Sequence, residues 1–196
     1  MNAIALIPAA GHSRRIGRPK LSLPLGDSTV LGTLLDRLRD AGIEQRLVVV
    51  GSHVPELVPL CRKHGAEPLL LEADSPEMRT TLEAGFAWIG RRAPDFDAVL
   101  LCPGDHPQLD PAVVRRLLES RDGRIVIPTF VGKRGHPTLI PRVWVARLRE
   151  VPIDQGLNTF FRSHPEAVCE IPVESSRILD DIDTISDYER LKQHPV

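Results

Sequence analysis

AIALIPAAGHSRRIGRPK, at residues 3–20, joins an apolar run to a loop of small and basic residues. The apolar run stops at Pro8, and a run of this length that ends in a turn is typical of a buried β-strand. It is too short to span a bilayer and has no basic flank, which argues against a membrane helix and a signal peptide. The stretch therefore predicts a strand that leads directly into a turn.

The loop after this strand has the composition of an anion-binding site. Small residues at Ala9, Ala10 and Gly11 let the backbone approach a ligand, and consecutive N–H groups in such a turn bind anions. Three arginines and a lysine follow, and guanidinium groups match phosphate oxygens well. The glycine spacing fits neither a Walker loop nor a dinucleotide fingerprint. Two interpretations stay open, a polyphosphate-binding loop or a solvated loop whose arginines are surface charges.

The rest of the chain alternates between two periodicities. Further β-branched, apolar runs predict strands at 46–50, 68–71, 97–102, 124–127, 138–140 and 168–173. Stretches of helical period predict helices at 29–40, 54–64, 77–91, 111–120, 141–150, 155–163 and 184–193. This alternation predicts a three-layer α/β/α, Rossmann-like fold with a mostly parallel sheet, in one domain over residues 1–196. In such a sheet, ligands bind at the carboxyl ends of the strands.

Composition narrows the class of partner. The chain is 42% hydrophobic and 26% charged with a net charge of -1, so nothing favours a nucleic-acid or membrane partner. The three cysteines, at positions 61, 102 and 169, are far apart and odd in number, which predicts buried, inert thiols in a reducing cytoplasm. The seven histidines have no zinc-binding spacing and are expected to be mostly surface or structural residues.

Two acidic segments are candidate cation sites. Asp105 comes just after the buried strand at 97–102, where a hard cation that bridges phosphates would need a carboxylate. The alternative is a helix cap, although Asp110, directly before Pro111, is the better cap. A second group at 180–184 precedes the last helix, and its other interpretation is helix capping, because carboxylates also favour a helix N-terminus.

The N-terminal loop resembles the A-A-G-x-S-x-R-M-G-x-x-K signature of the nucleotidyltransferases that attach a nucleotide to molybdopterin, above all the molybdenum cofactor cytidylyltransferases, which are MobA-like NTP transferases. The matching residues are Ala9, Ala10, Gly11, Ser13, Arg15, Gly17 and Lys20, with Ile16 in the place of methionine. The resemblance implies a nucleotidyltransferase fold in which this loop wraps a triphosphate. It assigns catalytic roles to Arg15 and Lys20, which neutralise the phosphates, and leaves Arg14 and Arg18 as surface charges.

The acidic segments resemble two further motifs of this family. The run from Gly104 to Pro107 looks like G-D-x-P, whose aspartate holds Mg²⁺, so the resemblance assigns catalysis and metal binding to Asp105. His106 stands at its variable position and receives no catalytic role. Residues 181–184 look like the start of D-I-D-T-P-E-D, which completes the metal shell, and we favour Asp183 over Asp181 as the second ligand.

Three weaker likenesses concern the base and the acceptor. Residues 78–85 look like G-M-S-S-S-L-R-A-G, so Thr80 and Thr81 are either nucleotide ligands or ordinary helix residues. Residues 135–139 look like G-x-P-v-L, which lies beside the acceptor in the family. Residues 154–158 resemble G-D-x-G-A-R, but Asn158 replaces the arginine, which puts the usual acceptor contact in doubt.

The function that this resemblance implies is transfer of a nucleotide to molybdopterin. The terminal phosphate of molybdopterin attacks the α-phosphorus of the triphosphate, and pyrophosphate leaves. Mg²⁺ and the loop cations offset the repulsion between the two anions. The Ala-Ala-Gly form of the loop favours CTP over GTP.

Two alternatives stay open. One is a nucleotidyltransferase with another phosphorylated acceptor, such as a sugar phosphate or an alcohol phosphate. The other is a non-catalytic, nucleotide-binding maturation chaperone for a molybdenum enzyme such as a molybdenum hydroxylase. The presence of both metal carboxylates argues against the chaperone, because binding alone would tolerate their loss.

Overall fold

A central β-sheet organises the chain. The computed structural model describes residues 1–74, 77–93, 95–120, 122–152 and 155–193. The sheet has the strand order β10-β7-β9-β6-β1-β4-β5, with β8 paired to β7. Its strands are β1 (Ala3–Ala9), β4 (Gln45–Val50), β5 (Glu67–Leu70), β6 (Ala98–Leu101), β7 (Ile125–Phe130), β8 (Lys133–Arg134), β9 (Thr138–Pro141) and β10 (Val168–Pro172). A separate two-stranded ribbon contains β2 (Pro24–Leu25) and β3 (Ser28–Thr29).

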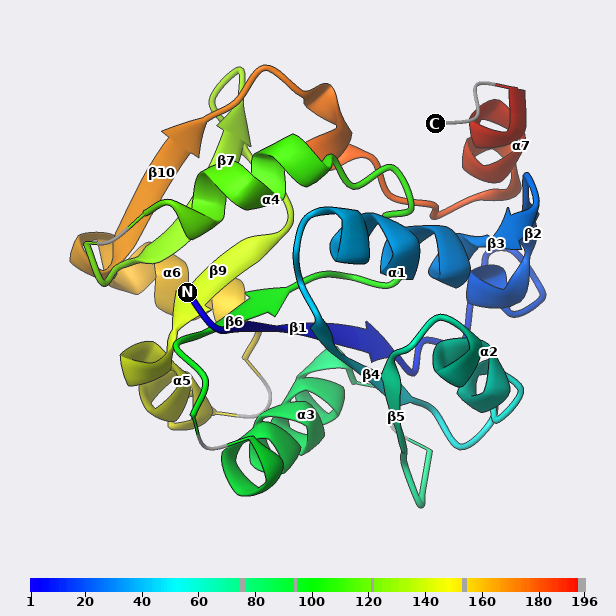
Figure 1. The fold of residues 1–196 in the computed structure, drawn as a ribbon, viewed down its shortest axis with the longest axis horizontal. Helices are drawn as coiled ribbons and strands as arrows, with labels where there is room; N and C mark the ends of the chain where they lie inside the picture. The colour runs from blue at the N-terminus through cyan, green and yellow to red at the C-terminus, as the bar shows by residue number, and fades with distance from the viewer. Residues whose placement is uncertain (75–76, 94, 121, 153–154, 194–196) are drawn as a thin grey trace.

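Helices cover both faces of this sheet (Figure 1). They are α1 (Val30–Asp40), α2 (Leu57–Lys63), α3 (Met78–Arg92), α4 (Pro111–Leu118), α5 (Arg142–Arg149), α6 (Leu157–Ser163) and α7 (Ile185–Gln193). Side chains of α1, α2, α4 and α7 pack into one core, and those of α3, α5 and α6 pack into the other. Strand β1 serves both cores, because Ala5 and Ile7 face the first while Ile4 and Leu6 face the second. The three-layer prediction is confirmed.

Strand β9 and the short strand β8 run against the parallel strands of the sheet. β6, β1, β4 and β5 are mutually parallel, whereas β9 is antiparallel to both of its neighbours, β6 and β7. Thr138, the first residue of β9, pairs with Leu101, the last residue of β6. The loop that enters β9 therefore lies at the edge where the parallel strands end, which is the edge where ligands bind.

The predicted elements are confirmed in kind and order, and the ends differ by a few residues. Helix α2 begins at Leu57 rather than at residue 54, because residues 54–56 form turns around Pro55. Helix α4 begins as predicted, since Asp110 accepts a hydrogen bond from the Ala112 amide at 2.8 Å and Pro111 occupies the first helical position. The short strands β2, β3 and β8 were not predicted, because a strand of only two residues is too short to show an alternating pattern of side chains.

Two further expectations concern membrane-spanning helices and the burial of the cysteines. Within the described residues, no helix has the length and apolar character needed to cross a membrane. Cys61 and Cys102 are buried, as expected, and burial raises the pKa of the Cys61 thiol to about 12. Cys169 is only partly buried, because it lies on the edge strand β10.

Candidate active site

Ser13 organises the loop that follows β1. Its carbonyl oxygen accepts hydrogen bonds from the amides of Ile16 and Gly17, each at 3.0 Å, and its hydroxyl accepts one from the Lys20 amide at 3.1 Å. Ser13 has a positive φ of 50°, which turns the chain sharply at this residue. The serine of the motif therefore shapes the loop and places Lys20, which lies seven residues farther along the chain.

The amides near the start of this loop are available to a ligand. Within the described residues, the N–H groups of Gly11, His12 and Arg14 form no hydrogen bond. These three residues line a hollow of about 340 Å³ together with Ser13, Arg15, Lys20 and Asp183. Unpaired amides beside cations form an anion-binding surface. Arg14 and Arg18 are both exposed, as expected of surface charges, and Arg14 also lines this hollow whereas Arg18 lies outside it.

Lys20 brings the two acidic segments together. Its ammonium lies 2.6 Å from Asp105 Oδ2 and 3.7 Å from Asp183 Oδ1, and it donates to the Ile182 carbonyl at 2.8 Å. The Ile182 amide in turn donates to the Asp105 carbonyl at 3.1 Å. The side chains of Lys20 and Asp105 are only 17% and 18% exposed, so this ion pair is partly shielded from water.

Carboxylates converge at this point. Asp183 also pairs with Arg15, whose Nη1 lies 2.8 Å from Asp183 Oδ2. The pKa of Asp181 is raised by its partial burial and by the negative charges of Asp183 and Asp105. Such repulsion favours a bound cation, and carboxylate oxygens are the ligands that Mg²⁺ and similar hard ions prefer. The residues present therefore fit a divalent cation held by Asp105 and Asp183.

Helix α7 is capped without using either candidate ligand. Thr184 Oγ1 accepts a hydrogen bond from the Asp187 amide at 3.2 Å, and Asp187 Oδ2 accepts one from the Thr184 amide at 2.8 Å. This reciprocal pair is a capping box. Within the segment 180–184, the capping role that the sequence left open is thus performed by Thr184 together with Asp187.

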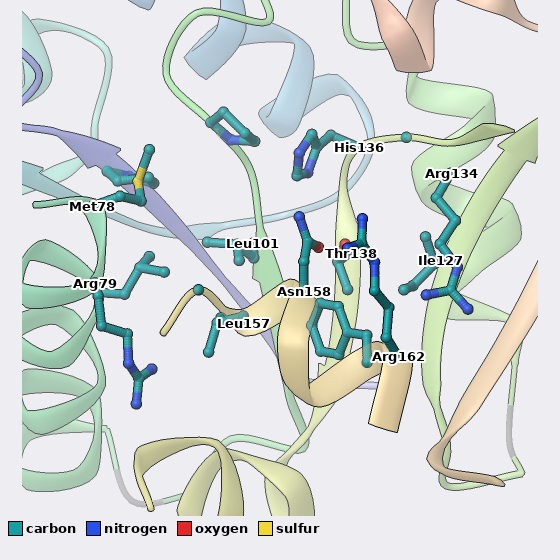
Figure 2. Close-up of a pocket in the computed structure, with 16 residues that line it drawn as sticks. Met78, Arg79, Leu101, Ile127, Arg134, His136, Thr138, Leu157, Asn158 and Arg162 are labelled. Atoms are coloured by element: carbon teal, nitrogen blue, oxygen red, sulfur yellow. The ribbon is translucent and has the colours of Figure 1, made fainter. Parts of the chain in front are cut away.

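A second cavity has a volume of about 460 Å³ (Figure 2). Apolar residues form much of its lining, namely Leu82, Leu101, Ile127, Leu157 and Phe161. The segment from Gly135 to Thr138 forms another part of the wall. At Gly135 an added Cβ would lie 2.4 Å from the Ile178 carbonyl oxygen, so only glycine allows this close approach. The volume and the mostly apolar lining are those of a small-molecule site.

Cations from two elements reach this cavity. Arg162 lies on α6 one turn beyond Asn158, and both side chains point into the cavity (Figure 2). Within the described residues Arg162 has no hydrogen-bonding or ion-pairing partner. Arg134 on β8 also lines the cavity and pairs with Glu170 at 2.7 Å. Arg79 is buried, and its Nη2 donates to the Leu148 carbonyl at 2.6 Å and pairs with Glu83 at 2.7 Å, whereas its Nε and Nη1 have no hydrogen-bond partner within the described residues.

The altered segment at 154–158 is described only in part. Residues 153 and 154 lie outside the described residues. Arg162 lies on the same helix as Asn158 and lines the same cavity, and sequence reasoning missed it. The available signal was the spacing, because residues four apart on a helix lie on the same face.

Two histidines connect the cavity with the carboxylates. The rings of His136 and His106 are in edge contact with centroids 5.1 Å apart, and His106 Nε2 lies 3.9 Å from Asp105 Oδ1. Burial lowers the pKa of His106, and burial followed by the charge of His106 lowers the pKa of His136 to about 4. Both rings are therefore neutral near pH 7. His106 is a neighbour of the site, as expected.

The two threonines at the start of α3 differ. Thr80 is exposed, whereas Thr81 is buried and its hydroxyl donates to the Glu77 carbonyl at 3.4 Å. Thr81 thus serves the helix, which was the second of the two roles open to it. A nucleotide contact by the side chain of Thr80 stays a prediction.

Comparison with known proteins agrees with this geometry. A family model described as the MobA-like NTP transferase domain matches residues 5–168. The chain is 35% identical over 132 residues to 2-C-methyl-D-erythritol 4-phosphate cytidylyltransferase of Rhodococcus jostii, a match that covers 65% of this chain and 55% of the relative. The chain thus spans about half the length of the curated methylerythritol relatives that it matches.

Two other relatives match along nearly the whole chain. The molybdenum cofactor cytidylyltransferase of Escherichia coli is 25% identical over 195 residues, which covers 98% of this chain and 97% of that protein. The crystal structure of Rv0371c from Mycobacterium tuberculosis H37Rv has a TM-score of 0.84 at 30% identity, with 97% and 98% of the two chains covered. A second structure of Rv0371c is a complex with manganese, with a TM-score of 0.75 at 27% identity and 98% of each chain covered.

Proposed function

Because the chain belongs to the family of MobA-like NTP transferase domains, we propose that it transfers CMP from CTP to the phosphate of a small phosphorylated alcohol or sugar and releases pyrophosphate. The observation that carries this proposal is the position of Lys20. Its ammonium contacts Asp105 and Asp183 at the edge of the loop hollow, beside the turn that leads to the second cavity. One cation and two carboxylates thus stand between a place for the triphosphate and a place for an acceptor.

The chain's own residues supply binding and charge compensation. The free amides of the loop, with Arg15 and Lys20, bind the β- and γ-phosphates and neutralise the leaving pyrophosphate. Asp105 and Asp183 hold a divalent ion, Mg²⁺ or Mn²⁺, and the manganese complex of Rv0371c supports this choice of ion class. When bound, such an ion withdraws charge from the phosphates and lowers the repulsion between donor and acceptor.

The reaction needs no activated side-chain nucleophile. A phosphate monoester oxygen of the acceptor is already anionic near pH 7, and it forms the new bond to the α-phosphorus as the bond to pyrophosphate breaks. Catalysis then depends mainly on positioning two anions against their repulsion. The choice of CTP is supported by the Ala-Ala-Gly form of the loop and by the cytidylyltransferase relatives.

The second cavity supplies the acceptor site in this proposal. The unpaired guanidinium of Arg162 binds the acceptor phosphate, and Asn158 contributes an amide beside it. The apolar part of the lining contacts the carbon skeleton of the acceptor. The methylerythritol phosphate relatives support a small alcohol phosphate as the acceptor class.

Molybdopterin is the second candidate acceptor. A specific observation favours it: the E. coli molybdenum cofactor enzyme matches this chain from end to end, whereas the methylerythritol enzymes match over about half of their length. Both acceptors present a phosphate to the same atoms, so the two candidates differ only in what fills the rest of the cavity.

The proposal is tested by following pyrophosphate release. The protein is incubated with Mg²⁺ or Mn²⁺, one triphosphate at a time, and 2-C-methyl-D-erythritol 4-phosphate, a panel of sugar phosphates or molybdopterin. We expect CTP to be consumed with an alcohol or sugar phosphate, and mass spectrometry to identify a CDP-linked product. Release with molybdopterin alone would select the second candidate, and no release with any acceptor would contradict the proposal.

Variants tie the activity to the site. Lys20→Ala and Asp105→Asn are each expected to abolish pyrophosphate release, because Lys20 supplies a positive charge that offsets the repulsion and Asp105 holds the divalent ion that does the same. Arg18→Ala is the matched control, since Arg18 is an exposed cation of the same loop outside the hollow. Unchanged turnover in the Lys20 or Asp105 variant would overturn the assigned roles.

A further inference from the structure

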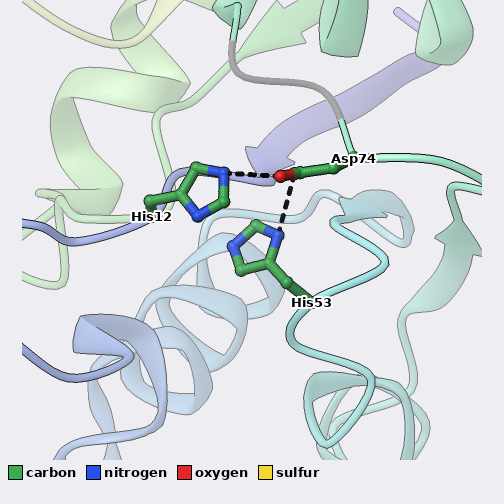
Figure 3. A group of neighbouring side chains, drawn as sticks. All are labelled: His12, His53 and Asp74. Carbon is green, nitrogen blue, oxygen red and sulfur yellow. Dashed lines mark ion pairs between the residues drawn. The ribbon is translucent and has the colours of Figure 1, made fainter.

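Two histidines and an aspartate meet at the edge of the sheet, beside the loop that follows β1, called here the nucleotide loop (Figure 3). His12 Nε2 lies 3.0 Å from Asp74 Oδ2, and His53 Nδ1 lies 3.2 Å from Asp74 Oδ1. The two imidazole rings stack with centroids 4.0 Å apart and planes inclined by 11°. Among the residues that the structure describes, this is the group whose histidine and carboxylate atoms all lie within 4.8 Å of one another.

The topology explains why residues so distant in sequence meet here. His12 follows β1, His53 follows β4 and Asp74 follows β5, and these three neighbouring strands are parallel. Their carboxyl ends therefore lie at one edge of the sheet. Gly51 makes room for the cluster, because a Cβ at this position would lie 2.8 Å from the His53 ring and 3.1 Å from the Ala10 backbone. The His53 ring is thereby held against the nucleotide loop.

We propose that His12, His53 and Asp74 bind a divalent transition-metal ion. Ligands about 2.0–2.2 Å from a shared ion lie roughly 3.0–3.5 Å from one another in tetrahedral or octahedral shells. The two contacts to Asp74, at 3.0 and 3.2 Å, are of this size. Each imidazole ring has a nitrogen that faces a carboxylate oxygen of Asp74. A single ion bound by the three residues would replace the two direct ring-to-carboxylate contacts.

The donor atoms select the class of ion. Two imidazole nitrogens and one carboxylate favour Zn²⁺ and its neighbours over Mg²⁺, which prefers an all-oxygen shell. The cluster thus differs in chemistry from the Asp105 and Asp183 pair, which offers oxygen alone. The side chains of His12 and His53 are 28% and 24% exposed and that of Asp74 is 50% exposed, so an ion can reach them from solvent.

The ion joins three loops at the mouth of the site. His12 directly precedes Ser13, the residue that shapes the nucleotide loop, while His53 and Asp74 belong to the loops after β4 and β5. Binding therefore fixes the start of the nucleotide loop against the neighbouring strand ends. This inference does not rest on the proposed function, because it concerns other residues and a different class of ligand.

Titration calorimetry with ZnCl₂ tests the site on the metal-free protein. We expect about one Zn²⁺ per chain, and the same stoichiometry and affinity in Asp105→Asn, which leaves the cluster intact. Both His53→Ala and Asp74→Asn should weaken binding by more than about 100-fold, because even loss of a residue that only supports a metal ligand weakens binding by about 10–100-fold. Circular dichroism checks that each variant is folded.

Asp74→Asn also distinguishes a metal site from a structural contact. An asparagine keeps the shape and can still hydrogen-bond to both rings, so a purely structural cluster would tolerate it, whereas a metal site loses its only charged ligand. The inference is overturned if the wild-type protein binds no Zn²⁺, if His53→Ala and Asp74→Asn bind it as tightly as wild type, or if Asp105→Asn abolishes binding.

Discussion

Lys20 is the residue on which the site depends most directly. It contacts two carboxylates and one carbonyl that come from two distant segments of the chain, and Ser13 fixes its backbone. A partly shielded ion pair that loses one partner leaves an uncompensated charge. Removal of Lys20 would leave the carboxylates of Asp105, Asp181 and Asp183 near one another without this cation. The electrostatic repulsion among them would therefore increase.

Arg162 leads to a prediction at the same scale. Arg162→Ala should raise the KM for the phosphorylated acceptor about 10- to 100-fold and leave the KM for CTP unchanged. The reason is that a charge-assisted hydrogen bond contributes about 1.5–3 kcal/mol, and Arg162 lines only the acceptor cavity. Steady-state kinetics in each substrate measures both constants.

The control for this prediction is Arg116→Ala, which removes an exposed cation from α4 outside that cavity. An unchanged acceptor KM in Arg162→Ala, or an equal rise for CTP, would show that Arg162 does not bind the acceptor phosphate.

Helix ends position the functional groups at the scale of the element. The capping box of α7 holds the chain just after Asp183. On α6, Arg162 lies one helical turn beyond Asn158, so the two side chains are on the same face of the helix. In both cases a local rule of helix geometry decides where a charge is presented.

We expect Thr184→Ala to lower the free energy of unfolding by about 1 kcal/mol, because the first turn of α7 loses its cap. The carboxylate of Asp187 loses the hydrogen bond from the Thr184 hydroxyl, the largest of the contacts that hold its pKa below the ordinary value, so this pKa should rise. Urea denaturation measures the first effect and NMR titration the second.

Thr184→Ser keeps the hydroxyl and serves as the matched variant. If Thr184→Ala were as stable as both the wild type and Thr184→Ser, the cap would have no part in the stability of α7.

The whole molecule brings distant segments together at one edge of the sheet. The reversed strand β9 carries Gly135 and His136 to the end of β6, and η3 (Ser176–Leu179) packs against them through the hydrogen bond from the His136 amide to the Ile178 carbonyl, at 2.8 Å. The two buried rings, His106 and His136, are consequences of this arrangement, and they affect the stability of the whole chain.

Stability should fall as the pH is lowered from 7 to 4. The unfolded chain protonates His136 near pH 6.5, whereas burial and the charge of His106 lower the folded pKa of His136 to about 4, so across this window the unfolded state binds more protons. The loss from His136 is about 3 kcal/mol by pH 4. His106 acts in the same direction, although the nearby carboxylate of Asp105 opposes the lowering of both pKa values.

Urea denaturation at a series of pH values measures this dependence. In His136→Gln the slope between pH 6.5 and pH 4 should be smaller than in the wild type. An identical slope in the two proteins would mean that His136 is not protonated at a lower pH in the folded state.

Local chemistry determined much of this protein from sequence alone. The strand and loop at residues 3–20, the order of strands and helices, the Asp110 cap and the place of Asp105 after a buried strand follow from side-chain periodicity, turn residues and helix capping, which act between near neighbours. The choice of Asp183 came from the family resemblance. The family resemblance of residues 9–20 is confirmed by the match of the family model.

The tertiary structure decided what these rules do not reach. The reversal of β9, the approach of Arg162 and Asn158 to residues 134–138, and the meeting of His12, His53 and Asp74 depend on which strands are neighbours and in which direction each runs. Side-chain pattern is the same for a parallel and an antiparallel strand that is buried on both faces. Contacts between residues far apart in the chain were therefore decided only when the two cores packed around the sheet.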